Sequence, residues 1–188
     1  MPPKIKITKE EIVKTSIELI RKNGEQAVNA RAIASLLNCS TQPIFFNFKN
    51  MDELLKESMI CTYNIYLNFI KNEVESKKYP EYKAFGMAYV RFAKEEPQLF
   101  RFLFMRDRTG EDFLPTADFS ASVELIMKAN DITKEQAELL HLEMWTCVHG
   151  IAVMMATSFL ALDWELISDI LSDIYHGLQK KQLLGAKN

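Results

Sequence analysis

The chain has 188 residues, of which 48% are hydrophobic and 26% charged, and its net charge of −2 gives no overall indication of a polyanionic partner. We expect a globular, cytoplasmic protein of one large domain or two small ones, because the sequence predicts no membrane span and its N-terminus lacks the apolar stretch of a signal peptide. The three cysteines, Cys39, Cys61 and Cys147, are odd in number and widely spaced, and they indicate neither a disulfide framework nor a zinc site.

Apolar residues recur at helical spacing along nearly the whole chain, which has only six glycines and six prolines. This pattern predicts an all-α fold of about nine helices with short connections. The first helix is expected from Thr8 to Asn23, and Thr8 and Glu11 have the spacing of a capping box. A short second helix is expected over residues 29–37, capped by Asn29. Its inward side chains are expected to be Ile33, Ala34, Leu36 and Leu37.

A third short helix is expected to begin at Ser40, whose side chain can cap it. Pro43 falls in its first turn, where a proline removes no intrahelical hydrogen bond. Asn38, in the preceding turn, tolerates the left-handed backbone conformation. A long fourth helix is then expected, beginning at Asn50 or Asp52 and ending at residues 77–80.

Five more helices are expected after Pro80, with one long loop between the second and the third of them. Their predicted ranges are 81–95, 97–105, 118–130, 133–160 and 163–184, and the loop is 106–117. Thr133 and Gln136 have the spacing of a second capping box, and Asp163 can cap the last helix.

The second and third predicted helices are joined by a tight turn and match the helix-turn-helix arrangement, whose second helix enters the major groove of DNA. Residues 1–56 carry nine Lys or Arg and six Asp or Glu, a net charge of +3, whereas the remainder has −5. We therefore expect the first part of the chain to contact phosphate. The sequence predicts a DNA-binding domain over residues 1–50 and a larger helical domain over 51–188.

The expected recognition helix carries small and polar side chains on its outward face. Thr41, Gln42 and Asn47 have groups that can read base edges, and Gln42 is the best candidate for two hydrogen bonds to adenine. Pro43 is suited to contact a thymine methyl group.

Phosphate contacts are expected from Lys6, Arg31 and Lys49. The alternative is that these are ordinary solvated side chains, because short amphipathic helices with polar caps are common. The aromatic cluster at 45–48 is, taken alone, more typical of a core than of a base-stacking surface, since Ile44 and Phe48 share a helical face.

Residues 8–55 resemble the tetracycline-repressor (TetR) family of one-component regulators. As in that family, the segment has Arg-x-Ile-Ala in the second helix, a Ser-led third helix, and Phe-x-x-x-x-Glu-Leu leading into the fourth. The matching positions are Arg31, Ile33, Ala34, Ser40, Phe48, Glu53 and Leu54. The resemblance implies a homodimer whose two recognition helices enter successive major grooves of a near-palindromic operator.

Three positions depart from the family's pattern, and they affect single contacts more than the mode of binding. Gln42 stands where the family usually has a glycine, and Phe45 where it usually has a tyrosine whose hydroxyl commonly touches phosphate. Met51 replaces a frequent lysine, for which Lys49 is the candidate substitute. Ser40 and Phe45 complete the residues at which DNA contact is expected.

The C-terminal part is rich in methionine and aromatic side chains, which line adaptable apolar cavities as well as cores. We expect an apolar or aromatic effector to bind in a cavity between its helices. The candidate lining residues are Phe92, Phe100, Phe104, Met105, Phe119, Trp145 and His149. Trp145-x-x-x-His149-Gly150 places two rings on one helical face and resembles a motif in the ligand-binding domain of one TetR subgroup. For His149 the alternative is a core histidine with one hydrogen bond.

The last two predicted helices carry apolar stripes that can pack against a second copy as a four-helix bundle, which predicts a homodimer. The alternative is that both stripes are buried within the monomer. The stripes are Leu139, Leu142, Val148, Ile151, Ala152 and Met155, and then Trp164, Ile167, Leu171, Ile174 and Leu178.

No nucleophile and base can be combined from local spacing, and no glycine-rich phosphate loop occurs. The single Glu138-x-x-His141 pair lacks the second copy that a carboxylate-bridged metal site needs. We therefore expect no enzyme, no metal site and no cofactor. The sequence predicts a ligand-released repressor. The alternatives are a regulator of the same fold that responds to a protein partner or acts constitutively, and a helical small-molecule-binding protein.

Overall fold

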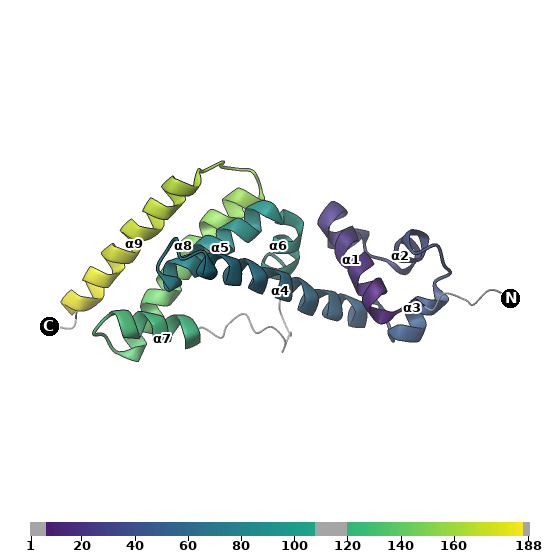
Figure 1. The fold of residues 1–188 in the computed structure, drawn as a ribbon, viewed down its shortest axis with the longest axis horizontal. Coiled ribbons are helices and arrows are strands. Elements are labelled where there is room, and N and C mark those ends of the chain that lie inside the picture. The colour runs from purple at the N-terminus through teal and green to yellow at the C-terminus, as the bar shows by residue number, and fades with distance from the viewer. Residues whose placement is uncertain (1–6, 108–119, 186–188) are drawn as a thin grey trace. The chain divides into compact units, whose positions relative to one another are not determined.

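A computed structural model of the protein describes residues 7–107 and 120–185 (Figure 1). These residues form nine α-helices and one short 3-10 helix and contain no strand, which confirms the predicted all-α fold. The helices are α1 (Lys9–Asn23), η1 (Glu25–Ala27), α2 (Ala30–Leu36), α3 (Gln42–Asn47), α4 (Met51–Glu75), α5 (Glu81–Glu95), α6 (Pro97–Phe104), α7 (Ser120–Ala129), α8 (Lys134–Ala156) and α9 (Trp164–Gly185).

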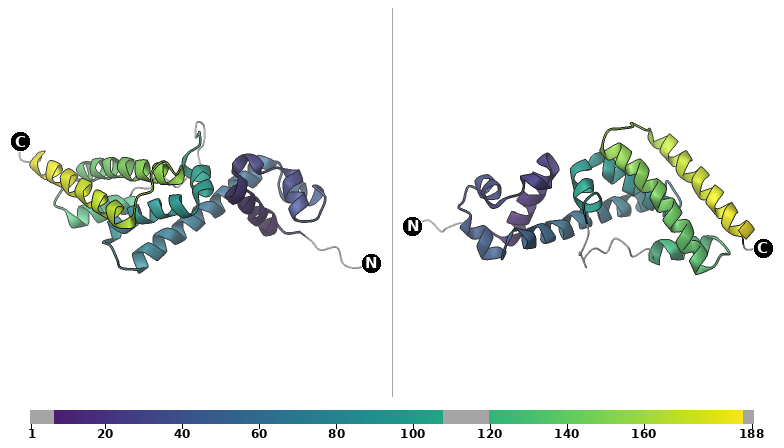
Figure 2. Two further views of the ribbon diagram at one scale, coloured as in Figure 1. Left: turned by 90° about the horizontal axis from the view of Figure 1, so that it is seen from above. Right: turned by 180° about the vertical axis from the view of Figure 1, so that it is seen from behind.

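The chain divides into two compact units. The first holds α1 to α3, α4 through Leu67, and α6, and the second holds the end of α4, α5 and α7 to α9. In the first unit α6 packs against α1, where the Arg21 guanidinium lies 2.8 Å from the Glu96 carboxylate. In the second unit α8 packs against α5, α7 and α9 (Figure 2). Compact units need not coincide with functional domains, and the functional division at residue 50 stays a prediction.

Most of the predicted helix starts are confirmed by capping side chains that accept hydrogen bonds from backbone N–H groups of the first turn. Thr8 Oγ1 accepts the Glu11 N–H at 3.2 Å, and the Glu11 carboxylate accepts the Thr8 N–H at 2.8 Å. Asn29 caps α2, and Asn50, rather than Asp52, caps α4 by accepting the Glu53 N–H at 2.9 Å. These contacts span three residues, so local sequence is enough to specify them.

The predicted cap of the third helix at Ser40 is wrong. The helix begins at Gln42, and Thr41 already has the helical backbone angles φ −70° and ψ −14° without a side-chain cap. The Thr41 carbonyl accepts the N–H groups of Ile44 and Phe45, so the first turn closes through the backbone. Ser40 therefore lies one residue too early to act as the cap. The left-handed conformation predicted for Asn38 is confirmed, with φ 51°.

Two further expectations about α2 and α8 are wrong. Leu36 is exposed, because it lies to one side of the α2 face on which Ile33 and Ala34 are buried. The eighth helix ends at Ala156 and not near Leu160. Ser158 takes the left-handed φ of 57°. Its N–H donates to the Met155 carbonyl, and the Phe159 N–H donates to the Met154 carbonyl. This is a Schellman motif, which terminates a helix, formed here without glycine.

The expectation that no segment could span a membrane needs a correction for α8. Residues 144–162 contain no Asp, Glu, Lys or Arg, and α8 is long and apolar enough to cross a membrane by length and composition alone. Nine α8 side chains are, however, buried within the second unit. A buried core helix passes the same test, so we interpret α8 as the central helix of this unit.

The cap of α8 leads to a stability prediction. Thr133 Oγ1 accepts the Gln136 N–H at 3.3 Å, and the Gln136 side chain accepts the Thr133 N–H at 2.8 Å. Thr133→Ala is expected to lower the free energy of unfolding by about 1 kcal/mol, measured by urea denaturation. Thr146→Ala is the control, because Thr146 is exposed in the middle of the same helix, where alanine is the better helix former. Equal losses in both variants would contradict the role of the cap.

Candidate nucleic-acid interface

The first unit has a helix-turn-helix built on a compact apolar core. Ile12 and Ile20 of α1, Ile33 of α2 and Ile44 of α3 are fully buried, and Phe48 follows α3 in the same core. Ile44 and Phe48 thus hold the third helix to this core. Because the two residues are four apart, they lie on one face of α3 and orient the helix.

The predicted DNA-contacting residues lie on α2, on α3 or directly beside them. Arg31, Ser40, Gln42 and Lys49 are exposed, and Thr41, Pro43 and Asn47 are half-buried. Phe45 has half of its side chain exposed. Lys6 lies outside the described residues. The roles of all these residues in DNA binding stay predictions.

The aromatic cluster at 45–48 divides between core and surface. Phe48 is buried, as a core residue should be, but Phe45 is 50% and Phe46 77% exposed. The interpretation of the whole cluster as core was therefore wrong for these two residues. The helical period contained the signal, because a residue two positions from both Ile44 and Phe48 must point away from their face. Phe46 is thus a surface residue of α3 that sequence reasoning missed.

Gln42 and Asn47 differ in how available their amide groups are. The Asn47 side-chain nitrogen donates to the Pro43 carbonyl at 2.8 Å, which holds the amide against its own helix. A contact to a base edge would have to share or break this bond. Gln42 is exposed at the first position of α3 and makes no side-chain hydrogen bond with a described residue. Gln42 is therefore the stronger candidate for a bidentate contact to adenine.

The charge around α2 and α3 suits a polyanion. No Asp or Glu occurs between Glu25 and Asp52, and Arg31 and Lys49 are the charged residues of this stretch. Neither makes an ion pair with a described residue. Lys9, in contrast, pairs with Glu57 at 2.7 Å and lies over the Phe48 ring, 5.2 Å from its centroid. The cations next to α3 are thus available for phosphate, whereas Lys9 is held by the protein itself.

The predicted effector-binding residues fall into two groups. Phe92, Trp145 and His149 belong to the second unit, and Phe100, Phe104 and Met105 to the first. The Trp145 and His149 rings stack with centroids 5.2 Å apart, which confirms that they share a helical face. The Phe100 and Phe104 rings lie 5.3 Å apart. Phe119 lies outside the described residues, and a pocket lined by all seven stays a prediction.

His149 is half-buried and has a defined polar neighbour. Its Nδ1 lies 2.9 Å from the Tyr89 hydroxyl oxygen, and burial lowers the pKa of the imidazole below its usual value. The ring is therefore neutral at physiological pH, with one nitrogen as donor and the other as acceptor. This geometry is compatible with the core histidine of the alternative interpretation and with a ligand contact.

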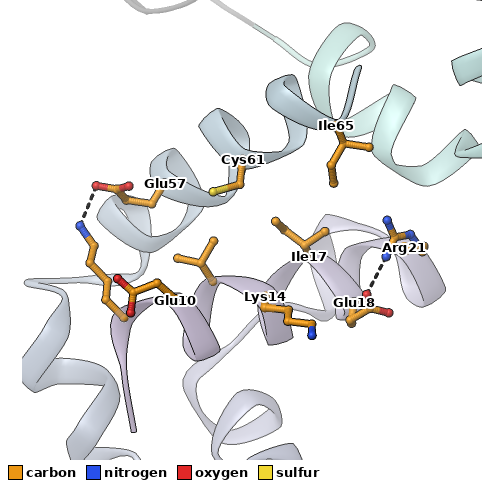
Figure 3. A pocket seen from close by; sticks show the side chains of 10 residues that line it. Glu10, Lys14, Ile17, Glu18, Arg21, Glu57, Cys61 and Ile65 are labelled. Carbon is orange, nitrogen blue, oxygen red and sulfur yellow. Dashed lines mark hydrogen bonds and ion pairs between the residues drawn. The ribbon is translucent and has the colours of Figure 1, made fainter. Parts of the chain in front are cut away.

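A surface pocket of about 440 Å³ lies in the first unit between α1 and α4 (Figure 3). Val13, Ile17, Cys61 and Ile65 line its apolar part, and charged side chains surround them. None of the predicted effector-binding residues lines this pocket. Burial raises the pKa of the Cys61 thiol, which disfavours the reactive thiolate.

Known proteins resemble the chain in sequence over residues 82–172 and in fold over nearly its whole length. Residues 82–172 match the family model described as Tetracyclin repressor-like, C-terminal domain. A TetR-like transcriptional regulator from Rhodococcus sp. RHA1 superposes with a TM-score of 0.64 and 13% identity over 98% of this chain and 99% of that chain. A TetR family protein from Vibrio parahaemolyticus has a TM-score of 0.62 and 16% identity, over 90% and 97%. The search of curated proteins finds no match.

The chain has a TetR-like fold. The family model covers the chain from α5 to the middle of α9, whereas the resemblance noted in the sequence covers residues 8–55. These two observations concern separate parts of the chain. The subgroup suggested by Trp145, His149 and Gly150 stays a prediction.

Proposed function

We propose that the protein is a dimeric, cytoplasmic transcriptional repressor that binds a near-palindromic operator through α3 and is released from it by a small apolar or aromatic effector. The outward surface of α3 carries this proposal. It presents Gln42 from a helix that Ile44 and Phe48 orient, within a stretch that has cations but no carboxylates. The protein is then a regulator and not an enzyme, and it needs no cofactor.

The apolar side chains of α8 and α9 that remain exposed support a dimer, whereas several others are buried within the unit. Val148, Ile151 and Ala152 of α8, with Ile167 and Leu171 of α9, are buried within the unit. Leu139, Leu142 and Leu166 remain exposed on the same two helices. No described atom outside their own helices lies within 4 Å of where a Cβ would stand on Gly150 or Gly177, so another backbone can approach there. A two-fold pairing of these helices would bury the exposed leucines.

Effector control requires a difference in affinity between two states. A ligand lowers DNA affinity only if it binds better to the conformation that binds DNA less well. Two recognition helices about 34–36 Å apart fit successive major grooves, and a change of a few ångström would mismatch them. The stacked Trp145 and His149 rings, with Tyr89 beside them, form an aromatic group suited to an apolar or aromatic effector.

The proposal is tested by selecting bound duplexes from a random DNA pool. We expect one near-palindromic sequence, bound tightly and with an affinity that falls steeply as salt rises. Gln42→Ala is expected to weaken this binding about tenfold or more, since each dimer loses two base contacts. Gln98→Ala, on α6 of the same unit, is the control and should leave the affinity unchanged.

Two results would contradict the proposal at different points. Enrichment of no sequence, with only weak binding at low salt, would show that α3 does not read DNA. If a specific operator is found but no apolar or aromatic compound weakens its binding, the protein would still be a DNA-binding regulator. The proposed control by an effector would then be wrong.

A further inference from the structure

Phe46 is an exposed aromatic side chain on the helix that the proposed function places in DNA. Its 77% exposure is the largest among the large apolar side chains of the described residues. Phe45 beside it is half-exposed, so the two rings form an apolar patch on α3. Contiguous exposed apolar surface on a soluble protein commonly marks an interaction site.

The orientation of α3 leaves Phe46 no place in the core. A helix turns by about 100° per residue, so Phe46 lies on the side opposite Ile44 and Phe48, which are buried. The same geometry puts Phe46 only about 40° around the helix from Gln42. Rotating α3 to bury Phe46 would expose Ile44 and Phe48. The protein therefore presents an amide and a phenyl ring together on one outward face.

The partner that fits this face offers hydrogen-bonding groups next to an apolar group. In the major groove adenine presents N7 and the N6 amino group, and thymine adds a 5-methyl group that apolar side chains contact. The absence of Asp and Glu between Glu25 and Asp52 favours this polyanionic partner over an apolar protein surface.

We propose that Phe46 is a specificity-determining residue that packs against the 5-methyl group of a thymine in the operator. This inference rests on the proposed function, because it requires α3 to lie in the major groove. Side chains four residues apart on a helix are about 5–6 Å apart, and successive bases are about 3.4 Å apart. The thymine is therefore expected within one or two base pairs of the base that Gln42 contacts.

The test uses the duplex selected for the full-length protein. Each thymine is replaced in turn by deoxyuridine, which removes the 5-methyl group and keeps the base pair, and the affinity is measured at one salt concentration. At the thymine that Phe46 contacts, one in each half-site, we expect the loss of the methyl group to weaken binding roughly fourfold, and about 15-fold when both half-sites are changed. Phe46→Ala should bind the thymine and deoxyuridine duplexes of this position with equal affinity.

Phe159→Ala is the matched control, because Phe159 is 76% exposed but lies between α8 and α9 of the other unit. This variant should keep the wild-type preference for thymine. Phe46→Leu, which retains an apolar side chain, should keep part of that preference. Both α3 variants change an exposed residue, so their far-UV circular dichroism should match the wild type.

Three results would overturn the inference. The first is a wild type that is insensitive to every 5-methyl group of its operator, and the second is a Phe46→Ala variant that keeps the full preference. A loss of self-association in Phe46→Ala with an unchanged preference for thymine would assign the patch to a protein contact instead. In all three cases the selected operator itself would stand, whereas failure to select any operator would refute the proposed function as well.

Discussion

Phe48→Ala is expected to lower the free energy of unfolding of the first unit by about 3–5 kcal/mol. Phe48 is almost completely buried with Ile44 and Leu54, and the alanine would leave a cavity in this core. Phe46→Ala, two residues earlier, is expected to change the same free energy by less than about 0.5 kcal/mol, because Phe46 is exposed. The pair compares the same chemical change at opposite sides of one short helix.

The measurement must report on the first unit. Both tryptophans, Trp145 and Trp164, lie in the second unit, so tryptophan fluorescence would follow the wrong part of the chain. Amide hydrogen exchange in α1 to α3 reports local opening of the helix-turn-helix directly. Similar losses of protection in the two variants would contradict the orientation of α3, and with it the outward face on which the proposed function depends.

His141 is expected to make the stability of the second unit depend on pH between about 7 and 4. It is buried on α8, its Nδ1 lies 2.9 Å from the Tyr82 hydroxyl oxygen, and burial lowers its pKa to about 4. The unfolded chain binds a proton on this histidine near pH 6.5, whereas the folded chain binds it only near pH 4. Between these pH values the unfolded state binds more protons than the folded state. The contribution of His141 to stability is therefore fully present above about pH 6.5 and is lost as the pH falls.

The contribution of His141 is expected to be on the order of 2 kcal/mol across this interval. It is measured by urea unfolding followed by tryptophan fluorescence, which here reports on the correct unit. His141→Gln keeps a polar side chain opposite Tyr82 but cannot titrate. Below pH 6.5 the free energy of unfolding of the wild type should therefore fall relative to that of the variant. Above pH 7 the two should have parallel pH dependence. Parallel curves over the whole range would show that His141 is not held neutral by burial.

Local sequence was sufficient wherever a structure is made by residues within one helical turn. The capping boxes at Thr8 and Thr133 and the caps at Asn29 and Asp163 each join a side chain to a backbone N–H three residues later. The buried pair Ile44 and Phe48 follows from the helical period alone. These features specify the helix-turn-helix and most helix boundaries.

Contacts between distant segments were decided only by the tertiary structure. Arg21 meets Glu96, the Ser16 and Ser58 hydroxyls bond inside the core, and His141 meets Tyr82. A helical period shows which side chains share a face, but not which other helix covers that face. For the same reason the sequence did not show that Phe100 and Phe104 lie in one compact unit and Trp145 and His149 in the other, and a pocket lined by both pairs stays a prediction. Most helices and their starts were therefore determined by the local sequence alone. Which helix packs against which, and hence the neighbours of each candidate site residue, depended on the packing of the whole chain.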